Sequence, residues 1–291
     1  MSEVEHVLAV QSEAGESPHW DASQQALYWA DIVDPHLYKY TPVDGQLKTF
    51  QIGIPVTGLG LRQSGGLVLA AKTGLYLMGA QLSLPELVID PEKDKTNVRF
   101  NDGLVDPQGR YWAGTLNEVD FSASDGSLYR LDPDGTLHLM DSGLKGPNGI
   151  AWSPDHRTMY LVDSFAQKIY AYDYEPDAGH ISNRRVFAEV PADSGAPDGL
   201  TVDSQGFVWN AHWGGWRVTR YDPSGSIERE IRLPVQNVTS CIFGGEDLGD
   251  LYITTAWFLL SEQDRLAQPL AGDLFRYRPG VSGLPDPKYA G

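Results

Sequence analysis

The sequence predicts an all-β protein that folds as a six-bladed β-propeller. Short alternating runs, rich in aromatic and β-branched residues and bounded by Gly, Pro, Asp or Ser, are typical of strands. The chain has 291 residues, including 31 glycines and 19 prolines, and no stretch shows the sustained apolar spacing of a helix. A turn that leads into such a strand also recurs six times along the chain.

The recurring module sets the number of blades. Its copies span 19–29, 62–69, 106–112, 153–160, 203–209 and 244–252. The strand residues at 29, 69, 112, 160, 209 and 252 lie about 40 to 50 residues apart, which is the period of propeller blades. A single blade cannot bury both faces of its small sheet, so six of them are expected to stack in a ring.

A second hairpin signal follows each module and completes a blade of about four strands. The N-terminal run 7–10 is too short to be a blade, so we expect it to pair beside 274–277 and close the last blade. The whole chain, 1–291, would then be a single propeller domain. An array of β-sandwiches is the alternative architecture, but it does not demand so regular a period.

Composition excludes several classes of function. The net charge of −17 and the pI near 4.7 argue against nucleic acid or an anionic membrane as a partner, since both need clustered Lys and Arg. No run reaches the ~20 apolar residues that span a bilayer. The lone Cys241 cannot form an intramolecular disulfide, and Glu3 and Glu5 stand where a signal peptide needs basic residues. We therefore expect a cytoplasmic protein.

Polar residues enter the predicted blades at matching places. Asn148 and Asp198 stand in equivalent x-Pro-[Asn/Asp]-Gly frames, Asn101 precedes Asp-Gly, and Glu16 lies just ahead of a strand. A single Pro-Asn-Gly or Asp-Gly is by itself only a turn signal. Asn101, Asn148 and Asp198, however, fall at equivalent positions in successive modules, and the loops that enter the innermost strands are expected to face one central channel.

Three of these residues form an all-oxygen donor set of net charge about −2. Glu16, Asn148 and Asp198 suit one hard divalent cation, for which calcium, magnesium and manganese fit best. Carboxylate oxygen also binds zinc, and ferrous iron stays among the candidates. The sequence therefore predicts a central metal site without identifying its metal.

These residues also belong to a resemblance. The chain resembles the SMP-30/gluconolactonase family, also called the regucalcin family, over nearly its full length. The matching stretches are 15–18, 62–66, 99–103, 109–115, 146–153, 197–199, 213–215 and 237–241. The resemblance implies a six-bladed propeller, one divalent metal held by Glu16, Asn148 and Asp198, and lactone hydrolysis as the commonest activity.

The resemblance also implies a substrate site. Arg99 and Asn101 would contact sugar hydroxyls. Some relatives carry two successive acids after the Gly-Thr of the 109–115 stretch, whereas this chain keeps Glu118 and has Val119 at the second position. Glu118 is assigned to the substrate on that basis.

The predicted activity is metal-dependent hydrolysis of a sugar-acid lactone to the free aldonic acid. Attack of water on a lactone carbonyl builds an oxyanion that a cation stabilises. Asp198 is the candidate base, directly or through the metal's own water, and Glu16 is the alternative. Phosphotriester hydrolysis and a non-catalytic calcium-binding propeller are the competing functions. We expect a small-molecule lactone as the partner, and a monomer or weak homo-oligomer.

Two further residues, His212 and Trp213, have two alternative roles. His212 and Trp213 end a predicted strand, where they could line the pocket or pack within a blade.

A covalent mechanism is disfavoured, because no Gly-x-Ser-x-Gly elbow is present and Cys241 has no identifiable partner base.

Overall fold

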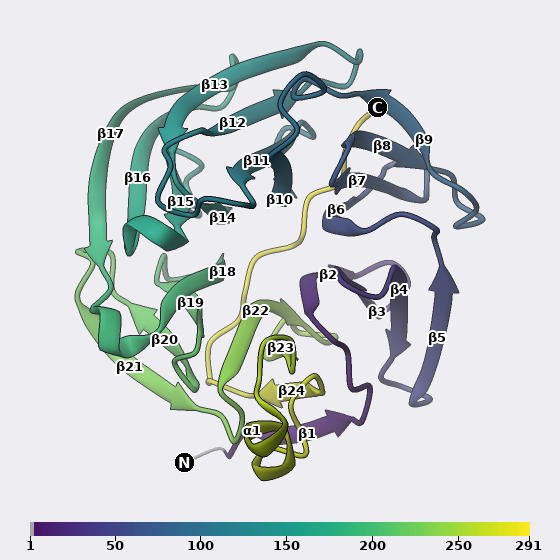
Figure 1. Ribbon diagram of the computed structural model, residues 1–291, viewed down its shortest axis with the longest axis vertical. Helices are drawn as coiled ribbons and strands as arrows, with labels where there is room; N and C mark the ends of the chain where they lie inside the picture. The colour runs from purple at the N-terminus through teal and green to yellow at the C-terminus, as the bar shows by residue number, and fades with distance from the viewer. Residues whose placement is uncertain (1–2) are drawn as a thin grey trace.

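The computed structural model describes residues 3–291, so the first two residues of the expected 1–291 domain lie outside it. Within that range the chain forms six four-stranded sheets arranged around a common centre (Figure 1). All strand pairs within the sheets are antiparallel. The predicted all-β, six-bladed propeller is confirmed.

The first three blades are formed by consecutive strands. Blade 1 comprises β2 (Gly15–Asp21), β3 (Ala26–Asp31), β4 (His36–Thr41) and β5 (Gln46–Gln51). Blade 2 comprises β6 (Val56–Leu61), β7 (Leu67–Ala71), β8 (Gly74–Met78) and β9 (Glu86–Ile89). Blade 3 comprises β10 (Val98–Val105), β11 (Tyr111–Asn117), β12 (Gly126–Leu131) and β13 (Leu137–Leu144).

The next two blades repeat this order, and the sixth takes one strand from the N-terminus. Blade 4 comprises β14 (Pro147–Trp152), β15 (Thr158–Asp163), β16 (Lys168–Glu175) and β17 (His180–Glu189). Blade 5 comprises β18 (Ala196–Val202), β19 (Val208–Trp213), β20 (Arg217–Tyr221) and β21 (Ile227–Arg232). Blade 6 comprises β22 (Asn237–Gly244), β23 (Asp250–Ala256), β24 (Leu274–Tyr277) and β1 (Glu5–Leu8).

The connections contain short helices, namely η1 (Ser164–Ala166), η2 (Ala192–Ser194) and α1 (Glu262–Ala267). No helix in residues 3–291 has the length and apolar character needed to cross a bilayer.

The strand β1 joins the two ends of the chain in one sheet. It pairs with β24 from Glu5 opposite Arg276 to Leu8 opposite Leu274. The expected closing run, 7–10, overlaps β1 only at its first two residues. Pairing begins earlier, at Glu5, whose Oε2 accepts hydrogen bonds from the Arg276 guanidinium at 2.7 and 3.2 Å.

The innermost strands make the ring. Each first strand contacts the first strands of both neighbouring blades, in the order β2, β6, β10, β14, β18, β22 and back to β2. Residues that start these strands therefore approach one another although they lie far apart in the sequence.

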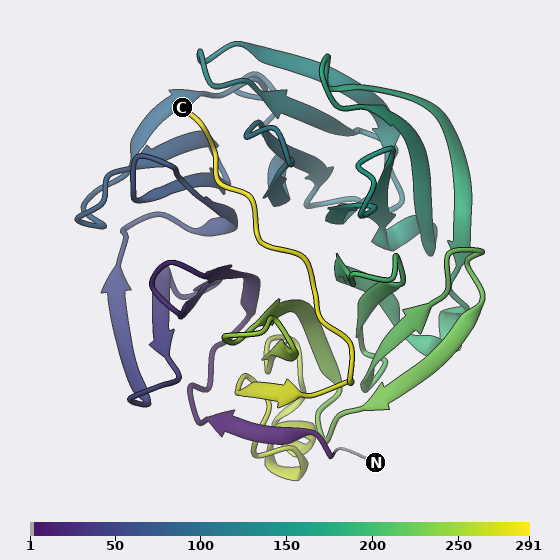
Figure 2. The same cartoon turned by 180° about the vertical axis from the view of Figure 1, so that it is seen from behind.

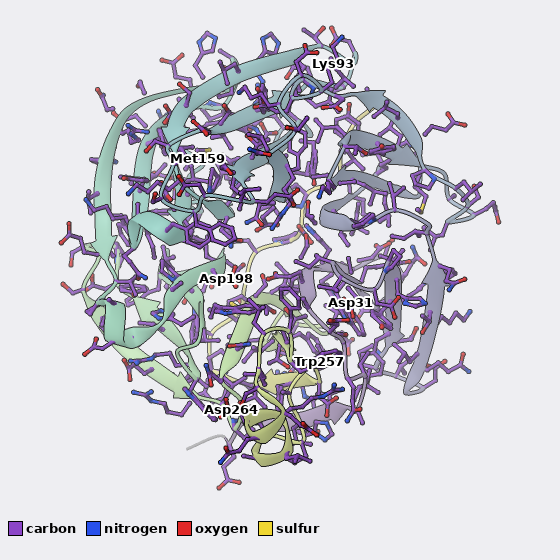
Figure 3. All side chains as sticks on the ribbon, viewed as in Figure 1. Asp31, Lys93, Met159, Asp198, Trp257 and Asp264 are labelled. Carbon is purple, nitrogen blue, oxygen red and sulfur yellow. The ribbon has the colours of Figure 1, made fainter. Side chains whose placement is uncertain are left out.

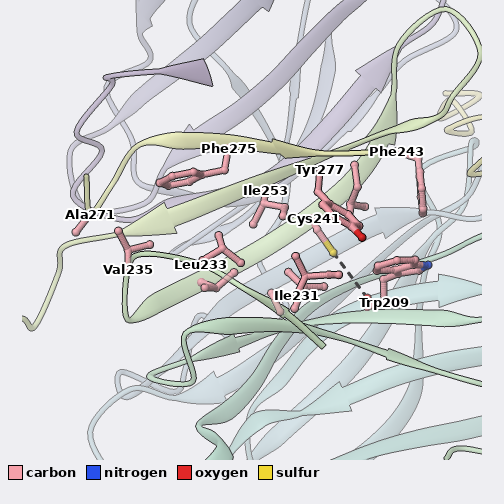
Figure 4. Close-up of a cluster of buried hydrophobic side chains, with 14 residues drawn as sticks. Trp209, Ile231, Leu233, Val235, Cys241, Phe243, Ile253, Ala271, Phe275 and Tyr277 are labelled. Atoms are coloured by element: carbon pink, nitrogen blue, oxygen red, sulfur yellow. Dashed lines mark hydrogen bonds between the residues drawn. The ribbon is translucent and has the colours of Figure 1, made fainter. Parts of the chain in front are cut away.

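The hydrophobic core lies between blades. Figure 4 shows one such layer, in which Trp209 of β19 and Ile231 of β21 meet Phe243, Ile253 and Phe275 of blade 6. Each blade thereby buries an apolar face against its neighbour, which explains why every position of the second strands β3, β7, β11 and β23 is buried.

The recurring turn has a structural cause in blades 3 and 5. Asp106 Oδ2 accepts a hydrogen bond of 2.9 Å from Trp112 Nε1, and Asp203 Oδ2 accepts one of 2.9 Å from Trp209 Nε1. An arginine completes each cluster, with Arg110 Nε at 2.7 Å and Arg220 Nε at 3.0 Å from the same oxygens. The Asp and Trp of the module are thus partners six residues apart.

The residues after β24 cross the centre of the ring on the face seen in Figure 2. Tyr289 there is 1% exposed, and its backbone N–H donates to the Leu61 carbonyl at 2.7 Å. The Asp286 carboxylate contacts His19 of blade 1. This segment therefore covers the back of the inner strands, a role that sequence reasoning did not assign to it.

Candidate functional site

All six first strands have the same irregularity near their starts. A β-bulge lets two residues of one strand oppose one residue of its partner, so it turns side chains out of the regular alternation. The register shifts lie between Glu16 and His19, Val56 and Gly58, Phe100 and Gly103, Pro147 and Ile150, Pro197 and Leu200, and Val238 and Ser240.

The candidate residues occupy these bulges. Asn101, Asn148 and Asp198 lie inside the bulges of blades 3, 4 and 5, and Glu16 borders that of blade 1. Figure 3 labels Asp198 at the centre-facing start of β18. The Pro-[Asn/Asp]-Gly frames seen in the sequence are therefore bulges, whose glycines allow the close approach of neighbouring backbone.

That approach is seen at Gly149. A Cβ placed there would lie 2.3 Å from the backbone nitrogen of Leu200 in the next blade, so no larger residue fits. Gly199 is equally confined, because a Cβ at that position would lie 2.0 Å from the Ser240 hydroxyl oxygen. The glycine after each site residue thus allows the inner strands to converge.

Asn148 and Asp198 are in direct contact. The Asn148 Nδ2 amide donates to Asp198 Oδ1 and, at 3.1 Å, to Ser164 Oγ of η1. Asp198 is 4% exposed, while Asn148 is half-buried. Two adjacent blades therefore present an amide and a carboxylate to the same point.

Glu16 belongs to the same electrostatic group. Burial raises the pKa of Glu16 well above its ordinary value, and the charges of Asp198 and Asp102 raise it further. Burial likewise raises the pKa of Asp198 well above its ordinary value, with Asp102 contributing. Burial and neighbouring negative charges thus disfavour the charged forms of both carboxyls. A bound cation would stabilise those charged forms.

Asp102 is a site residue that sequence reasoning missed. Burial raises the pKa of its carboxyl to about 6. It accepts a hydrogen bond of 2.7 Å from the Gly103 backbone and another from the Ser17 hydroxyl. Its position directly after Asn101, in the same bulge, is the signal that could have identified it.

Ser17 connects these groups. Its φ of 51° is uncommon for a residue other than glycine, and its hydroxyl accepts the Leu59 backbone N–H at 2.9 Å. The Ser17 backbone N–H donates to Glu16 Oε2 at 3.3 Å. The strained conformation thus orients the Glu16 carboxylate while linking blades 1, 2 and 3.

The donor set fits a hard divalent cation. Within residues 3–291 no three His, Cys, Asp or Glu side chains form a metal-binding cluster by themselves, so the set depends on the Asn148 amide. Two carboxylates and one amide oxygen are ligands that calcium, magnesium and manganese prefer. His19 is engaged elsewhere, because its ring hydrogen-bonds both the Asp286 carboxylate, at 2.7 Å from Nδ1, and the Leu59 backbone.

The residues assigned to the substrate form one connected group. Arg99 Nη1 donates to the Phe100 carbonyl at 2.8 Å and to Asn101 Oδ1 at 3.0 Å. Arg99 Nε lies 3.5 Å from Glu118 Oε2. Asn101 Nδ2 donates at 3.0 Å to the carbonyl of Pro147, the residue before Asn148. Arg99, Asn101 and Glu118 therefore lie beside the Glu16, Asn148 and Asp198 group.

His212 lies opposite Pro197, the residue before Asp198, but within residues 3–291 neither His212 nor Cys241 hydrogen-bonds a residue of this group. His212 Nδ1 contacts the Ser194 carbonyl at 2.9 Å, and burial lowers the pKa of His212 to about 4. The Cys241 thiol is buried at 3.8 Å from the Trp209 carbonyl, and burial raises its pKa. A neutral, enclosed thiol is a poor nucleophile.

Aromatic rings border the site, which the sequence did not indicate. Phe121 and Phe165 stack with their centroids 4.5 Å apart, and both are partly exposed. Phe165 belongs to η1, next to the Ser164 that contacts Asn148. These rings offer an apolar edge to a bound molecule.

Comparisons with known proteins identify the family of the chain. A family model described as the SMP-30/gluconolactonase/LRE-like region matches residues 14–257. The chain is 37% identical to regucalcin of Oryctolagus cuniculus over 294 residues, covering 99% of this chain and 98% of that protein. It is 37% identical to the 6-deoxy-6-sulfogluconolactonase of Pseudomonas putida over 286 residues, covering 98% of each.

A solved structure agrees as well. The calcium-binding regucalcin of Agrobacterium tumefaciens matches with a TM-score of 0.92 and 26% identity, covering 99% of this chain and 97% of that one. The family and its relatives support a lactonase-type activity. The chain therefore belongs to the SMP-30/gluconolactonase/LRE-like family.

Proposed function

We propose that this protein is a divalent-metal-dependent hydrolase of sugar-acid lactones. The observation that supports the proposal most is the convergence of Glu16, Asn148 and Asp198 beside the hydrogen-bonding side chains of Arg99 and Asn101. The relative from P. putida is named for a sulfo-substituted gluconolactone, which favours an aldonolactone as the substrate class.

Glu16, Asn148 and Asp198 would hold the cation. When bound, it supplies polarisation of the lactone carbonyl and charge stabilisation as the oxyanion develops. Calcium is the first candidate, because the A. tumefaciens relative is described as calcium-binding. Magnesium, manganese, zinc and ferrous iron are the others to be tested.

Asp198 is the proposed general base. The oxygen of the attacking water bonds to the carbonyl carbon while Asp198 takes its proton, and the ring C–O bond then breaks. The proton passes from Asp198 to the departing ring oxygen, which becomes a hydroxyl of the free aldonic acid. Glu16 is the alternative base, because it shares the same buried electrostatic group.

Arg99 and Asn101 would orient the sugar. The Arg99 guanidinium is held by the Phe100 carbonyl and the Asn101 side chain, so its direction is fixed before the substrate binds. A preorganised donor loses less conformational entropy on binding. Phe121 and Phe165 would cover the apolar edge of the sugar ring.

The test is lactone hydrolysis by metal-stripped protein, before and after calcium, magnesium, manganese, zinc or ferrous iron is restored. Spontaneous hydrolysis is subtracted, and D-glucono-1,5-lactone is the first substrate. We expect one or more metals to restore turnover. No hydrolysis of any lactone with any metal would reject the proposal, and metal-dependent stability without turnover would favour a calcium-binding role.

Two variants separate the possible bases. Asp198→Asn and Glu16→Gln are each assayed at a metal concentration that saturates that variant, measured by direct metal binding. The variant that lacks the general base should lose about a hundredfold or more of kcat, whereas the other variant should lose less. Asp44→Asn, in an exposed turn of blade 1, is the control and should keep wild-type kcat.

A further inference from the structure

Lys72 is a basic side chain that neither the fold nor the proposed chemistry explains. It follows β7 in blade 2, and its Nζ contacts Glu118 Oε1 across the boundary between blades 2 and 3. Arg99 Nε faces the other oxygen of the same carboxylate, at 3.5 Å. One carboxylate is thus shared between two cations.

This three-residue group is continuous with the candidate site. Arg99 hydrogen-bonds Asn101 at 3.0 Å, and Asn101 hydrogen-bonds the Pro147 carbonyl at 3.0 Å, one residue before Asn148. A molecule whose reactive carbon lay at Glu16, Asn148 and Asp198 could therefore extend past Asn101 to Lys72. The side chain of Lys72 is half-exposed, while those of Arg99 and Glu118 are 20% and 24% exposed.

The charges at the two ends of this group differ. Two cations against one carboxylate leave a net charge of +1 at Lys72, Arg99 and Glu118, in a chain whose net charge is −17. At the other end, Glu16 and Asp198 would be balanced by a divalent cation. An anionic substituent would therefore be drawn toward Lys72 and Arg99.

Arg99 and Lys72 keep hydrogen-bond donors that could bind such a substituent. Arg99 Nη2 donates to no residue in the 3–291 range, and Lys72 Nζ has Glu118 as its only side-chain partner there. A partly exposed Lys–Glu pair adds little to stability, so fold stability is a weak reason for Lys72 to reach toward Glu118. Ammonium and guanidinium groups bind sulfonate, phosphate and carboxylate oxygens through charge-assisted hydrogen bonds.

We propose that Lys72 and Arg99 form an anion subsite that selects lactones bearing a sulfonate, phosphate or carboxylate at the end remote from the lactone carbonyl. This proposal rests on the proposed lactonase function for its substrate class. Lys72 is the specificity-determining residue, because Arg99 and Glu118 also serve a neutral sugar.

The test compares kcat and KM for D-glucono-1,5-lactone with those for its 6-phospho, 6-deoxy-6-sulfo and 6-carboxylate counterparts. Full-length metal-loaded protein is used as wild type, Lys72→Gln, Lys72→Arg and the exposed control Lys48→Gln. Lys72→Gln should raise KM for the anionic lactones about tenfold, with kcat and the neutral KM within about twofold of wild type. Lys72→Arg should keep the preference for anionic over neutral lactones. Comparison of the three anionic lactones shows which oxyanion the wild type favours.

Equal effects of Lys72→Gln on neutral and anionic lactones, or no effect on either, would overturn the subsite. Lack of any lactonase activity in the wild type would instead reject the proposed function. In that case, calorimetric binding of 6-phosphogluconate and gluconate to the same four proteins tests the subsite without turnover. Loss of 6-phosphogluconate affinity confined to Lys72→Gln supports it, and unchanged affinity rejects it.

Discussion

His19 Nδ1 lies 2.7 Å from Asp286 Oδ2, although 267 residues separate them in the chain. Their side chains are 2% and 3% exposed. The same carboxylate oxygen accepts the Trp20 backbone N–H at 3.2 Å. The C-terminal segment is therefore tied to the innermost strand of blade 1 by a buried histidine–carboxylate pair.

The pair should make stability depend on pH. Burial lowers the pKa of His19, but the Asp286 charge, the hydrogen bond to Asp286, the Asp102 charge and the Leu59 backbone outweigh burial, so the pKa is raised on balance from its ordinary 6.5. A histidine whose pKa is raised on folding contributes its stability fully below pH 6.5 and loses it as the pH rises through the folded pKa.

Asp286→Asn should accordingly lower the free energy of unfolding by about 3 kcal/mol at pH 6 and by less at pH 9, because the buried partner of a charged His19 is removed. Urea denaturation at both pH values measures the difference. Asp34→Asn removes the exposed partner of His36 and should have a smaller effect. Equal losses at pH 6 and pH 9 for Asp286→Asn would contradict a charged His19.

His212 should show the opposite dependence. Burial lowers the pKa of its imidazole to about 4, while the Ser194 carbonyl and the charges of Arg217, Glu230 and Arg232 make smaller contributions. The unfolded chain binds the proton near pH 6.5 and the folded chain does not. Stability is therefore present above pH 6.5 and is lost as the pH falls toward 4.

Replacement of His212 isolates this contribution. Asn in its place can still donate to the Ser194 carbonyl but does not titrate. Between pH 7 and pH 5, wild type should lose about 2 kcal/mol more unfolding free energy than His212→Asn. Urea denaturation at the two pH values checks the expectation, and parallel losses in the two proteins would show that His212 is charged when folded.

Asp203 should be a major stabilising residue of blade 5. It is fully buried and accepts hydrogen bonds from Trp209 Nε1 at 2.9 Å and Arg220 Nη2 at 2.7 Å. Asp203→Ala would leave the Arg220 guanidinium buried with its main partner gone, at a cost of about 3–5 kcal/mol in unfolding free energy. Asp222→Ala, at an exposed turn after β20, should change stability little; a similar loss in both would refute the expectation.

Metal removal should lower thermal stability. Glu16, Asn148 and Asp198 belong to blades 1, 4 and 5, so a cation bound to all three would favour the closed ring. At a hundred times its dissociation constant, such a cation adds about 3 kcal/mol, or about 4 °C in Tm for a chain of this size. Differential scanning calorimetry with and without EDTA measures this. Asn148→Ala should shrink the difference, and an unchanged Tm in wild-type protein would argue against a bound cation.

The blades were predictable because their signals are local. The Asp106 and Trp112 pair, like Asp203 and Trp209, lies within one turn and the strand that follows it. The equivalence of Asn148 and Asp198 was also visible, since each stands in its own short Pro-x-Gly frame. Repeats of a local pattern identify both a blade and the position within it that faces the centre.

What the sequence alone determined, then, was the number of blades, the family, and the residues that start the inner strands. Only the tertiary structure brought Lys72 to Glu118, Asp102 to Ser17 and Asp286 to His19. Each of these contacts joins different blades, or a blade and the C-terminal segment. No local pattern encodes them, because they arise when six blades close into a ring and every inner strand meets its neighbours.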